Sequence, residues 1–192
     1  MGQAIQAIVF DCFGVLATDY WEVFLDSLPA SADIEKAREI RRAYDNGLIV
    51  KVEFNKQIEL ATGSQFIGAE DEDAKIAKNH KLLSYIRDLR LRGYKIGILS
   101  NVASNWLRES FLDKDEQALF DDFVLSYEIG LIKPDPQVFK LTANRLKIPI
   151  TSIALIDDKS AYCQAAQKVG MSTVLYRNFN QCRRDLELLL ID

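Results

Sequence analysis

The sequence predicts an α/β fold in which a doubly wound, Rossmann-like parallel sheet is interrupted by an all-helical insertion. Three features of its 192 residues indicate this architecture. Short apolar runs of strand length, several of them ending in polar residues, recur along the chain. Amphipathic segments of helical length separate the later runs from one another. A long stretch between the first run and the others shows only helical spacing.

The first apolar run, residues 5–10, is rich in β-branched and aromatic side chains and stops at a polar residue, as a buried strand does. After Gly93 the chain alternates between apolar runs and amphipathic segments. Strands are therefore expected at 5–10, 94–99, 123–125, 152–156 and 173–175. Helices are expected at 105–111, 137–146, 160–169 and 181–190. Alternation of this kind is typical of a parallel sheet with helices on both faces.

Residues 20–92 show no convincing strand pattern. Apolar residues instead recur every three or four positions, for example at Ile34, Ala37 and Ile40, which is typical of amphipathic helices. We therefore expect a core formed by residues 1–17 and 93–192, with a helical insertion at 18–92. The densest acidic stretch, residues 70–73, is expected to be a solvated turn and helix start.

Composition argues against several classes of protein. Twenty-four Lys and Arg residues against 28 Asp and Glu give a net charge of −4, so no overall positive field would attract nucleic acid or an anionic membrane. No apolar run approaches the roughly 18 residues that span a bilayer, and no signal peptide is recognisable. Three widely spaced cysteines and a single histidine offer no zinc site and favour a reducing, cytoplasmic location.

Three of the expected strands end in residues with polar side chains, which are Asp11, the pair Ser100–Asn101 and the pair Asp157–Asp158. Ligands of open parallel sheets bind outside the carboxyl ends of the strands, so these side chains are expected to meet. Two carboxylates about 4 Å apart repel by roughly 4 kcal/mol at an effective dielectric near 20. A hard cation with oxygen ligands, such as Mg²⁺, would relieve this repulsion and bind phosphate oxygen in its remaining positions.

A lysine precedes the helix expected at 137–146. Pro134 disfavours helical geometry at Lys133 and so places this side chain in the loop before the helix. From that loop Lys133 can point into the cleft as a fixed positive charge. Ser100 and Asn101 in turn offer hydrogen-bond donors to phosphate oxygens where the next helix begins. The predicted ligand is therefore a phosphorylated small molecule.

These residues, in this order and each after an expected strand, resemble the motifs of the haloacid dehalogenase (HAD) superfamily, and the resemblance covers most of the predicted core. The four motifs correspond to residues 11–16 (DCFGVL), Ser100–Asn101, Lys133–Pro134 and Ile156–Asp157–Asp158. The insertion resembles in position the small helical cap of subfamily I. In that family the cap closes over the active site and selects substrates.

The resemblance implies a Mg²⁺-dependent phosphatase that acts on a small phosphomonoester. Asp11 would be the nucleophile and would form an aspartyl-phosphate that water later hydrolyses. Ser100 and Asn101 would bind the oxygens of the transferred phosphoryl group, while Lys133 would neutralise the charge that develops there. Because cap side chains set specificity, the motifs assign neither an individual substrate nor an oligomeric state. The implied metal ligands are the Asp11 side chain, the Phe13 main-chain carbonyl, Asp157 and Asp158.

Phe13 departs from the family pattern, in which most phosphatases carry a second aspartate two residues after the nucleophile. That aspartate protonates the leaving oxygen and activates water, assistance typically worth about 10²–10⁴-fold. Three interpretations follow: a phosphatase with a good leaving group or another acid, for which Asp19 is the reserve candidate; a 2-haloacid dehalogenase, from which halide leaves without a proton; or a weakened enzyme that serves as a ligand- or protein-binding module. Asp157 and Asp158 favour the phosphatase, because they would disfavour binding of an anionic haloacid.

Overall fold

The five expected strands form one sheet in the computed structural model, which describes residues 4–67 and 76–191. All strands run parallel, in the order β3-β2-β1-β4-β5. Their bounds are β1 Ala7–Phe10, β2 Lys95–Ser100, β3 Asp122–Leu125, β4 Ile153–Asp157 and β5 Ser172–Leu175. The strand order reverses at β1, which pairs with β2 on one side and with β4 on the other. The predicted doubly wound parallel sheet is confirmed.

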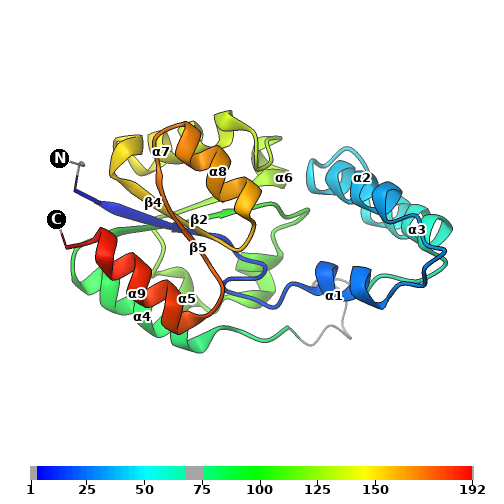
Figure 1. Cartoon of the computed structure of the whole chain (residues 1–192), viewed down its shortest axis with the longest axis horizontal. Coiled ribbons are helices and arrows are strands. Elements are labelled where there is room, and N and C mark those ends of the chain that lie inside the picture. Colours follow the sequence, from blue (N-terminus) through cyan, green and yellow to red (C-terminus); the bar gives the residue numbers. More distant parts are fainter. Residues whose placement is uncertain (1–3, 68–75, 192) are drawn as a thin grey trace.

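Helices cover both faces of this sheet (Figure 1). Their bounds are α4 His80–Leu91, α5 Lys114–Gln117, α6 Ser126–Ile129, α7 Pro136–Leu146, α8 Ser160–Lys168 and α9 Phe179–Leu189, with a 3₁₀ turn at Ile150–Ser152. Within the described part of the chain, no helix combines the length and the apolar character needed to cross a membrane.

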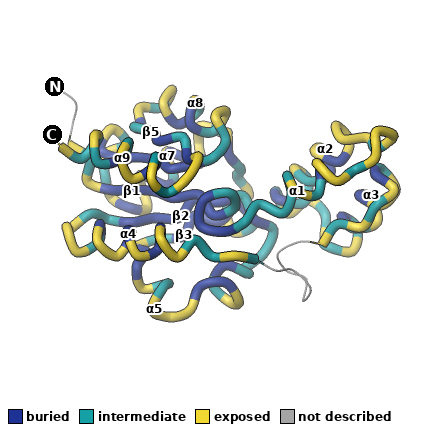
Figure 2. Tube along the Cα trace, turned by 60° about the horizontal axis from the view of Figure 1, so that its bottom comes forward, coloured by how far each residue is buried: buried dark blue, intermediate teal, exposed yellow. Residues whose placement is uncertain are grey.

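Side chains alternate between the two faces of the sheet along each strand. In β1, Ile8 and Phe10 are buried with residues of α4 and α9, whereas Val9 is buried with residues of α7 and α8. Each central strand therefore has to be apolar on both faces, which is why it forms an unbroken apolar run in the sequence. Figure 2 shows the outcome, a buried sheet enclosed by helices whose outer sides are exposed.

The helical insertion has a hydrophobic core of its own. Its helices are α1 Tyr20–Ser27, α2 Ile34–Asp45 and α3 Lys51–Thr62, and they lie apart from the sheet (Figure 1). Leu25, Ile40 and Phe54, one from each helix, are buried together. Asp19 and Asp33 are the N-caps of α1 and α2, because each carboxylate accepts a backbone N–H of the first helical turn.

The last helix within the predicted insertion, α4, packs on the sheet. The predicted insertion 18–92 includes α4, but Leu82 and Ile86 of this helix are buried with Ile8 and Phe10 of β1. Helical periodicity shows that one face of a helix is buried, but it does not show which element covers that face. The sequence pattern of α4 is therefore the same as that of the insertion helices before it. The acidic stretch 70–73, expected to be solvated, lies outside the described residues.

The segment expected to form an amphipathic helix at 105–111 contains a π-helical turn, which has more residues per turn than an α-helix. Leu107–Phe111 is a π-helical turn, closed by a hydrogen bond from the Leu112 N–H to the Leu107 carbonyl oxygen at 2.9 Å. This turn stacks Trp106 on Phe111, with 4.6 Å between the ring centroids. Aromatic pairs contribute about 0.5–1.5 kcal/mol beyond their burial, which favours this winding over a regular α-helix.

Candidate active site

The carboxyl ends of β1 and β4 place two aspartates next to each other. Phe10, the last residue of β1, is in register with Ile156 of β4. Asp11 follows immediately and donates its backbone N–H to the Ile156 carbonyl oxygen at 2.9 Å. Asp157 follows Ile156 and ends β4. The strand ends therefore meet as predicted.

Three carboxylates gather at this edge of the sheet. One oxygen atom each of Asp11, Asp157 and Asp158 lies within 4.8 Å of the other two. Asp11 and Asp157 are buried, and Asp158 is half-buried. The buried Oδ1 of Asp158 has no hydrogen-bond partner among the described residues. Three carboxylate oxygens at these separations are a donor set that suits a hard divalent cation such as Mg²⁺.

Lys133 provides a positive charge among these carboxylates. Its side chain is fully buried, and its Nζ lies 2.9 Å from Oδ1 of Asp11 and 2.6 Å from Oδ2 of Asp157. Asn101 holds the Lys133 main chain from both sides: its Oδ1 accepts the Lys133 N–H at 2.9 Å, and its Nδ2 donates to the Lys133 carbonyl oxygen at 3.0 Å. The loop after β2 thereby fixes the position of the lysine.

Burial makes the charges of this site perturb one another strongly. It raises the pKa of Asp11 to about 6, against the opposing attraction of Lys133. Burial also raises the pKa of Asp157 and that of Asp158. For Lys133, burial alone would lower the pKa, but the charges of Asp11 and Asp157 outweigh it and raise the pKa. Asp11 and Asp157 share this buried ammonium, whereas Oδ2 of Asp158 lies 3.4 Å from Nζ of Lys159, which also pairs with Asp19 and Glu22. Five carboxylates thus face two ammonium groups, and the excess negative charge favours a further cation.

Ser100 and Asn101 have different surroundings at the end of β2. Ser100 is buried, and its hydroxyl has no hydrogen-bond partner in residues 4–67 and 76–191. A buried polar group without a hydrogen-bond partner lowers the stability of the folded state by about 1–3 kcal/mol. A ligand oxygen that accepts a hydrogen bond from this hydroxyl would remove that cost and so bind favourably. The side-chain amide of Asn101, which the sequence suggests as a phosphate donor, is engaged instead by the main chain of Lys133.

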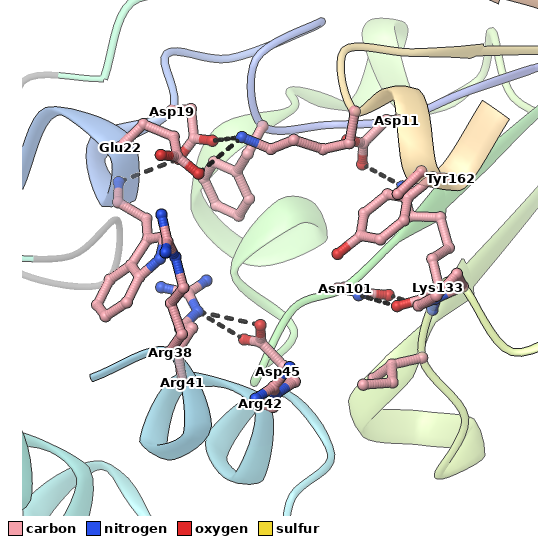
Figure 3. Close-up of a pocket in the computed structure, with 16 residues that line it drawn as sticks. Asp11, Asp19, Glu22, Arg38, Arg41, Arg42, Asp45, Asn101, Lys133 and Tyr162 are labelled. Atoms are coloured by element: carbon pink, nitrogen blue, oxygen red, sulfur yellow. Dashed lines mark hydrogen bonds and ion pairs between the residues drawn. The ribbon is translucent and has the colours of Figure 1, made fainter. Parts of the chain in front are cut away.

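A cavity of about 380 Å³ opens between this cluster and the insertion (Figure 3). Its volume lies in the range of roughly 300–1,000 Å³ that is usual for small-molecule sites. Side chains of the core and of α1 and α2 line it, among them Asp11, Phe13, Lys133, Tyr162, Trp21, Arg38, Arg41, Arg42 and Asp45. The sequence motifs do not mark Tyr162 or the arginines as site residues, although spacings of three and four residues from Arg38 do place Arg41 and Arg42 on one helix face.

No acid occupies the position of Phe13. Its ring stacks on Trp106, with 5.6 Å between the centroids and 15° between the ring planes, and it lines the cavity. Asp19, the reserve candidate for an acid, lines the cavity too. Its carboxylate, however, accepts the Trp21 N–H at 3.0 Å and lies 3.1 Å from Nζ of Lys159. Asp19 is thus engaged as a helix cap and as an ion-pair partner.

Gly14 allows the loop after β1 to approach Asp158. It has a φ of +84°, and a Cβ atom at this position would lie 2.6 Å from both Cγ and Oδ2 of Asp158. We expect Gly14→Ala to displace the Asp158 carboxylate. If the carboxylate cluster binds Mg²⁺, the substitution should weaken that binding by roughly 10–100-fold, the usual effect of disturbing a ligand's support. Calorimetric titration with Mg²⁺ measures this change.

Gly130→Ala is the matched control for that substitution. Gly130 also has a positive φ, +65°, but a Cβ there meets no atom within 4 Å. Both variants carry the backbone strain of an alanine in the left-handed region, about 1–2 kcal/mol, whereas only the Gly14 variant contacts Asp158. Equal loss of Mg²⁺ affinity in both variants would contradict a specific effect of the contact between Gly14 and Asp158 on the carboxylate cluster.

Residues 5–170, most of the chain, match the family model described as haloacid dehalogenase-like hydrolase. The chain belongs to this family. The match confirms the family that the four motifs suggest. Phosphatase MT3486 of Mycobacterium tuberculosis (strain CDC 1551 / Oshkosh) is 28% identical to this HAD-like hydrolase, in an alignment that covers 97% of this chain and 95% of the relative.

Two further similarities concern a longer protein and a solved structure. Bifunctional epoxide hydrolase 2 of Sus scrofa is 30% identical over 57% of this chain, and the chain spans only about a fifth, 20%, of that relative's length. A HAD family enzyme from Bacteroides thetaiotaomicron, solved in complex with magnesium and inorganic phosphate, superposes with a TM-score of 0.64. Its sequence is 22% identical over 91% of this chain and 95% of that chain, so this likeness shows the fold.

Proposed function

We propose that this HAD-like hydrolase is a Mg²⁺-dependent phosphatase that cleaves a small phosphomonoester through an aspartyl-phosphate on Asp11. One observation carries the proposal: Asp11 lines a cavity of small-molecule size, beside a buried lysine and within a cluster of three carboxylates. The buried, unpartnered hydroxyl of Ser100 supports it. A phosphatase among the relatives that align over nearly the whole chain supports it as well.

Asp11 would act as the nucleophile of this reaction. Its carboxylate attacks phosphorus, and the bond from phosphorus to the leaving oxygen breaks with the electron pair remaining on that oxygen. Ser100 would donate its hydroxyl to a phosphoryl oxygen, and Lys133 would neutralise the charge that develops between phosphoryl group and nucleophile. Asn101 would keep Lys133 in place through the two main-chain hydrogen bonds. Water then hydrolyses the aspartyl-phosphate and frees phosphate.

The proposed metal site consists of the side chains of Asp11, Asp157 and Asp158 and the main-chain carbonyl of Phe13. Bound Mg²⁺ would supply electrostatic stabilisation of the phosphoryl oxygens. The unpartnered Oδ1 of Asp158 and the excess of carboxylates over ammonium groups support this assignment. Lys133 and Lys159 together do not compensate that excess, because Lys159 is also shared with Asp19 and Glu22.

Restoring an acid at Phe13 is expected to increase activity on substrates with poor leaving groups. We expect Phe13→Asp to raise turnover of alkyl phosphates by roughly tenfold or more, because positioned proton donation is worth about 10²–10⁴-fold at best. Aryl phosphates, whose leaving oxygen needs little protonation, should gain much less. The ratio of the two rates in wild type and variant is the measurement. An unchanged ratio would mean that another group already supplies the proton or that the stack on Trp106 cannot accept the charge.

Purified protein assayed on two substrate panels distinguishes the proposal from its alternatives. We expect phosphate release from phosphomonoesters in Mg²⁺ and loss of that release in a chelator. Halide release from 2-haloacids without metal would establish the dehalogenase instead, as the aromatic residue at position 13 allows. Binding of phosphorylated ligands with neither product would establish a binding module.

A further inference from the structure

The part of the cavity wall that α2 forms carries three arginines and one aspartate, Asp45. Arg38, Arg41 and Arg42 of α2 all line the cavity, and Figure 3 shows them across it from Asp11 and Lys133. They come from one face of the helix, at spacings of three and four residues. The three guanidinium groups differ in what else they contact, and this difference decides which of them are available to a ligand.

Arg41 is committed to the structure of the insertion. Its Nε lies 2.9 and 3.0 Å from the two carboxylate oxygens of Asp45. Its guanidinium carbon lies 5.4 Å from the ring centroid of Trp21 and 5.9 Å from that of Phe66. A half-buried arginine with both an ion pair and stacked rings is held in one place. Arg41 therefore braces α2 against the aromatic core of the insertion.

Arg38 and Arg42 are held loosely or not at all. Arg38 pairs with Glu35 at 2.9 Å, but both side chains are exposed, by 49% and 81%, and such surface pairs contribute little. For the Arg42 side chain, no ion pair or hydrogen bond is found among residues 4–67 and 76–191. The other cations of the cavity, Lys133 and Lys159, each contact at least two carboxylates. Two arginine forks thus remain for a ligand.

We propose that Arg38 and Arg42 bind a second anionic group of the substrate, a carboxylate or phosphate at the end remote from the transferred phosphoryl group. This inference rests on the proposed phosphatase function and narrows its substrate class to phosphomonoesters that carry another anion. Guanidinium groups bind carboxylate and phosphate oxygens with two parallel hydrogen bonds, which gives orientation as well as affinity. Because the catalytic cluster and the two arginines line the same cavity, one small ligand can contact both.

Binding calorimetry with unreactive phosphonates tests this inference in the presence of Mg²⁺. The ligands are alkylphosphonates of two to five carbons, each compared with the same chain ending in a carboxylate and with the bisphosphonate of that length. We expect the wild-type protein to bind the doubly anionic ligand at least about tenfold more tightly at the chain length that spans the cavity, as charge-assisted hydrogen bonds allow. Comparing the carboxylate-ended with the phosphonate-ended ligands shows which second anion the arginines bind more tightly.

Substitutions assign the preference to the two arginines. In Arg38→Gln/Arg42→Gln the ratio of the two affinities should fall close to one, and Arg42→Lys, which keeps the charge and loses the fork, should lie between. Arg87→Gln, at an exposed position of α4, is the matched control and should keep the wild-type ratio. Thermal melting confirms that each variant is folded.

Equal affinities at every chain length, or a preference that survives the double substitution, would overturn the inference. Failure of the phosphatase proposal looks different. If no phosphomonoester is hydrolysed but the arginine-dependent preference is present, the anion site stands and the reaction is wrong. If phosphomonoesters with neutral and anionic tails are hydrolysed equally well, the reaction stands and the anion site is wrong.

Discussion

Replacing Asp11 with asparagine is expected to lower kcat/KM for phosphate release by at least about 10⁴-fold, as losses of a nucleophile do. The amide nitrogen and oxygen of asparagine cannot form the covalent phosphoryl intermediate. The substitution keeps the shape of the side chain, and an amide oxygen can still accept the Cys12 N–H, which lies 2.7 Å from Oδ1 of Asp11. The melting temperature of the variant should therefore stay close to that of the wild type, although its rate of phosphate release falls. Steady-state phosphate release in saturating Mg²⁺ gives the comparison.

Asp26→Asn is the control for the change of charge. Asp26 is an exposed residue of α1, so its variant loses the same carboxylate away from the cavity and should retain wild-type turnover. If Asp11→Asn kept most of the wild-type rate while remaining folded, another group would have to be the nucleophile.

Of the substitutions considered, Lys133→Met is expected to lower the unfolding free energy most. Methionine fills much of the volume of lysine but leaves the buried carboxylates of Asp11 and Asp157 without their ammonium partner. Removing one member of a buried ion pair costs about 3–5 kcal/mol of unfolding free energy. For a chain of this size each kcal/mol corresponds to roughly 2–4 °C, so the melting temperature should fall by about 6–20 °C. Phosphate release should be lost as well.

Two comparisons show whether charge is the cause of that loss. Lys140→Met, at an exposed position of α7, makes the same chemical change and should leave the melting temperature nearly unaltered. Adding Mg²⁺ should restore part of the stability of Lys133→Met, because a divalent cation compensates the same carboxylates and stabilises the folded state that binds it. A variant as stable as wild type without metal would show that the carboxylates do not need this lysine.

The sheet and the meeting of its strand ends could be predicted because both follow from simple rules. Strands buried on both faces have to be apolar throughout, as β1 is, and parallel strands bring their carboxyl ends to one edge. Asp11 and Asp157 therefore had to be neighbours once β1 and β4 paired. The place of Lys133 before Pro134 indicated that its side chain enters the cleft, and the resemblance to the family motifs implied its charge-neutralising role beside Asp11. Its contact with Asp157 was not predicted.

Contacts between distant segments were not predictable in the same way. Helical periodicity identified α4 but could not show that it packs on the sheet, and it could not show that α2 turns its arginines toward the cavity. The hydrogen bonds between Asn101 and Lys133 join residues 32 positions apart, and no local pattern marks them. Tyr162 has the spacing of a core residue of α8, yet it lines the cavity.

Rapid acid quenching during turnover, followed by peptide mass analysis, tests most directly whether Asp11 captures phosphorus. With Mg²⁺ and a hydrolysed phosphomonoester, the peptide that contains Asp11 should carry the mass of one phosphoryl group, and the same peptide of Asp11→Asn should carry none. Two results would contradict the aspartyl-phosphate on Asp11 if phosphate is released at the full rate. One is a phosphoryl mass shift on a peptide without Asp11, and the other is no phosphoryl mass shift on any peptide at any quench time.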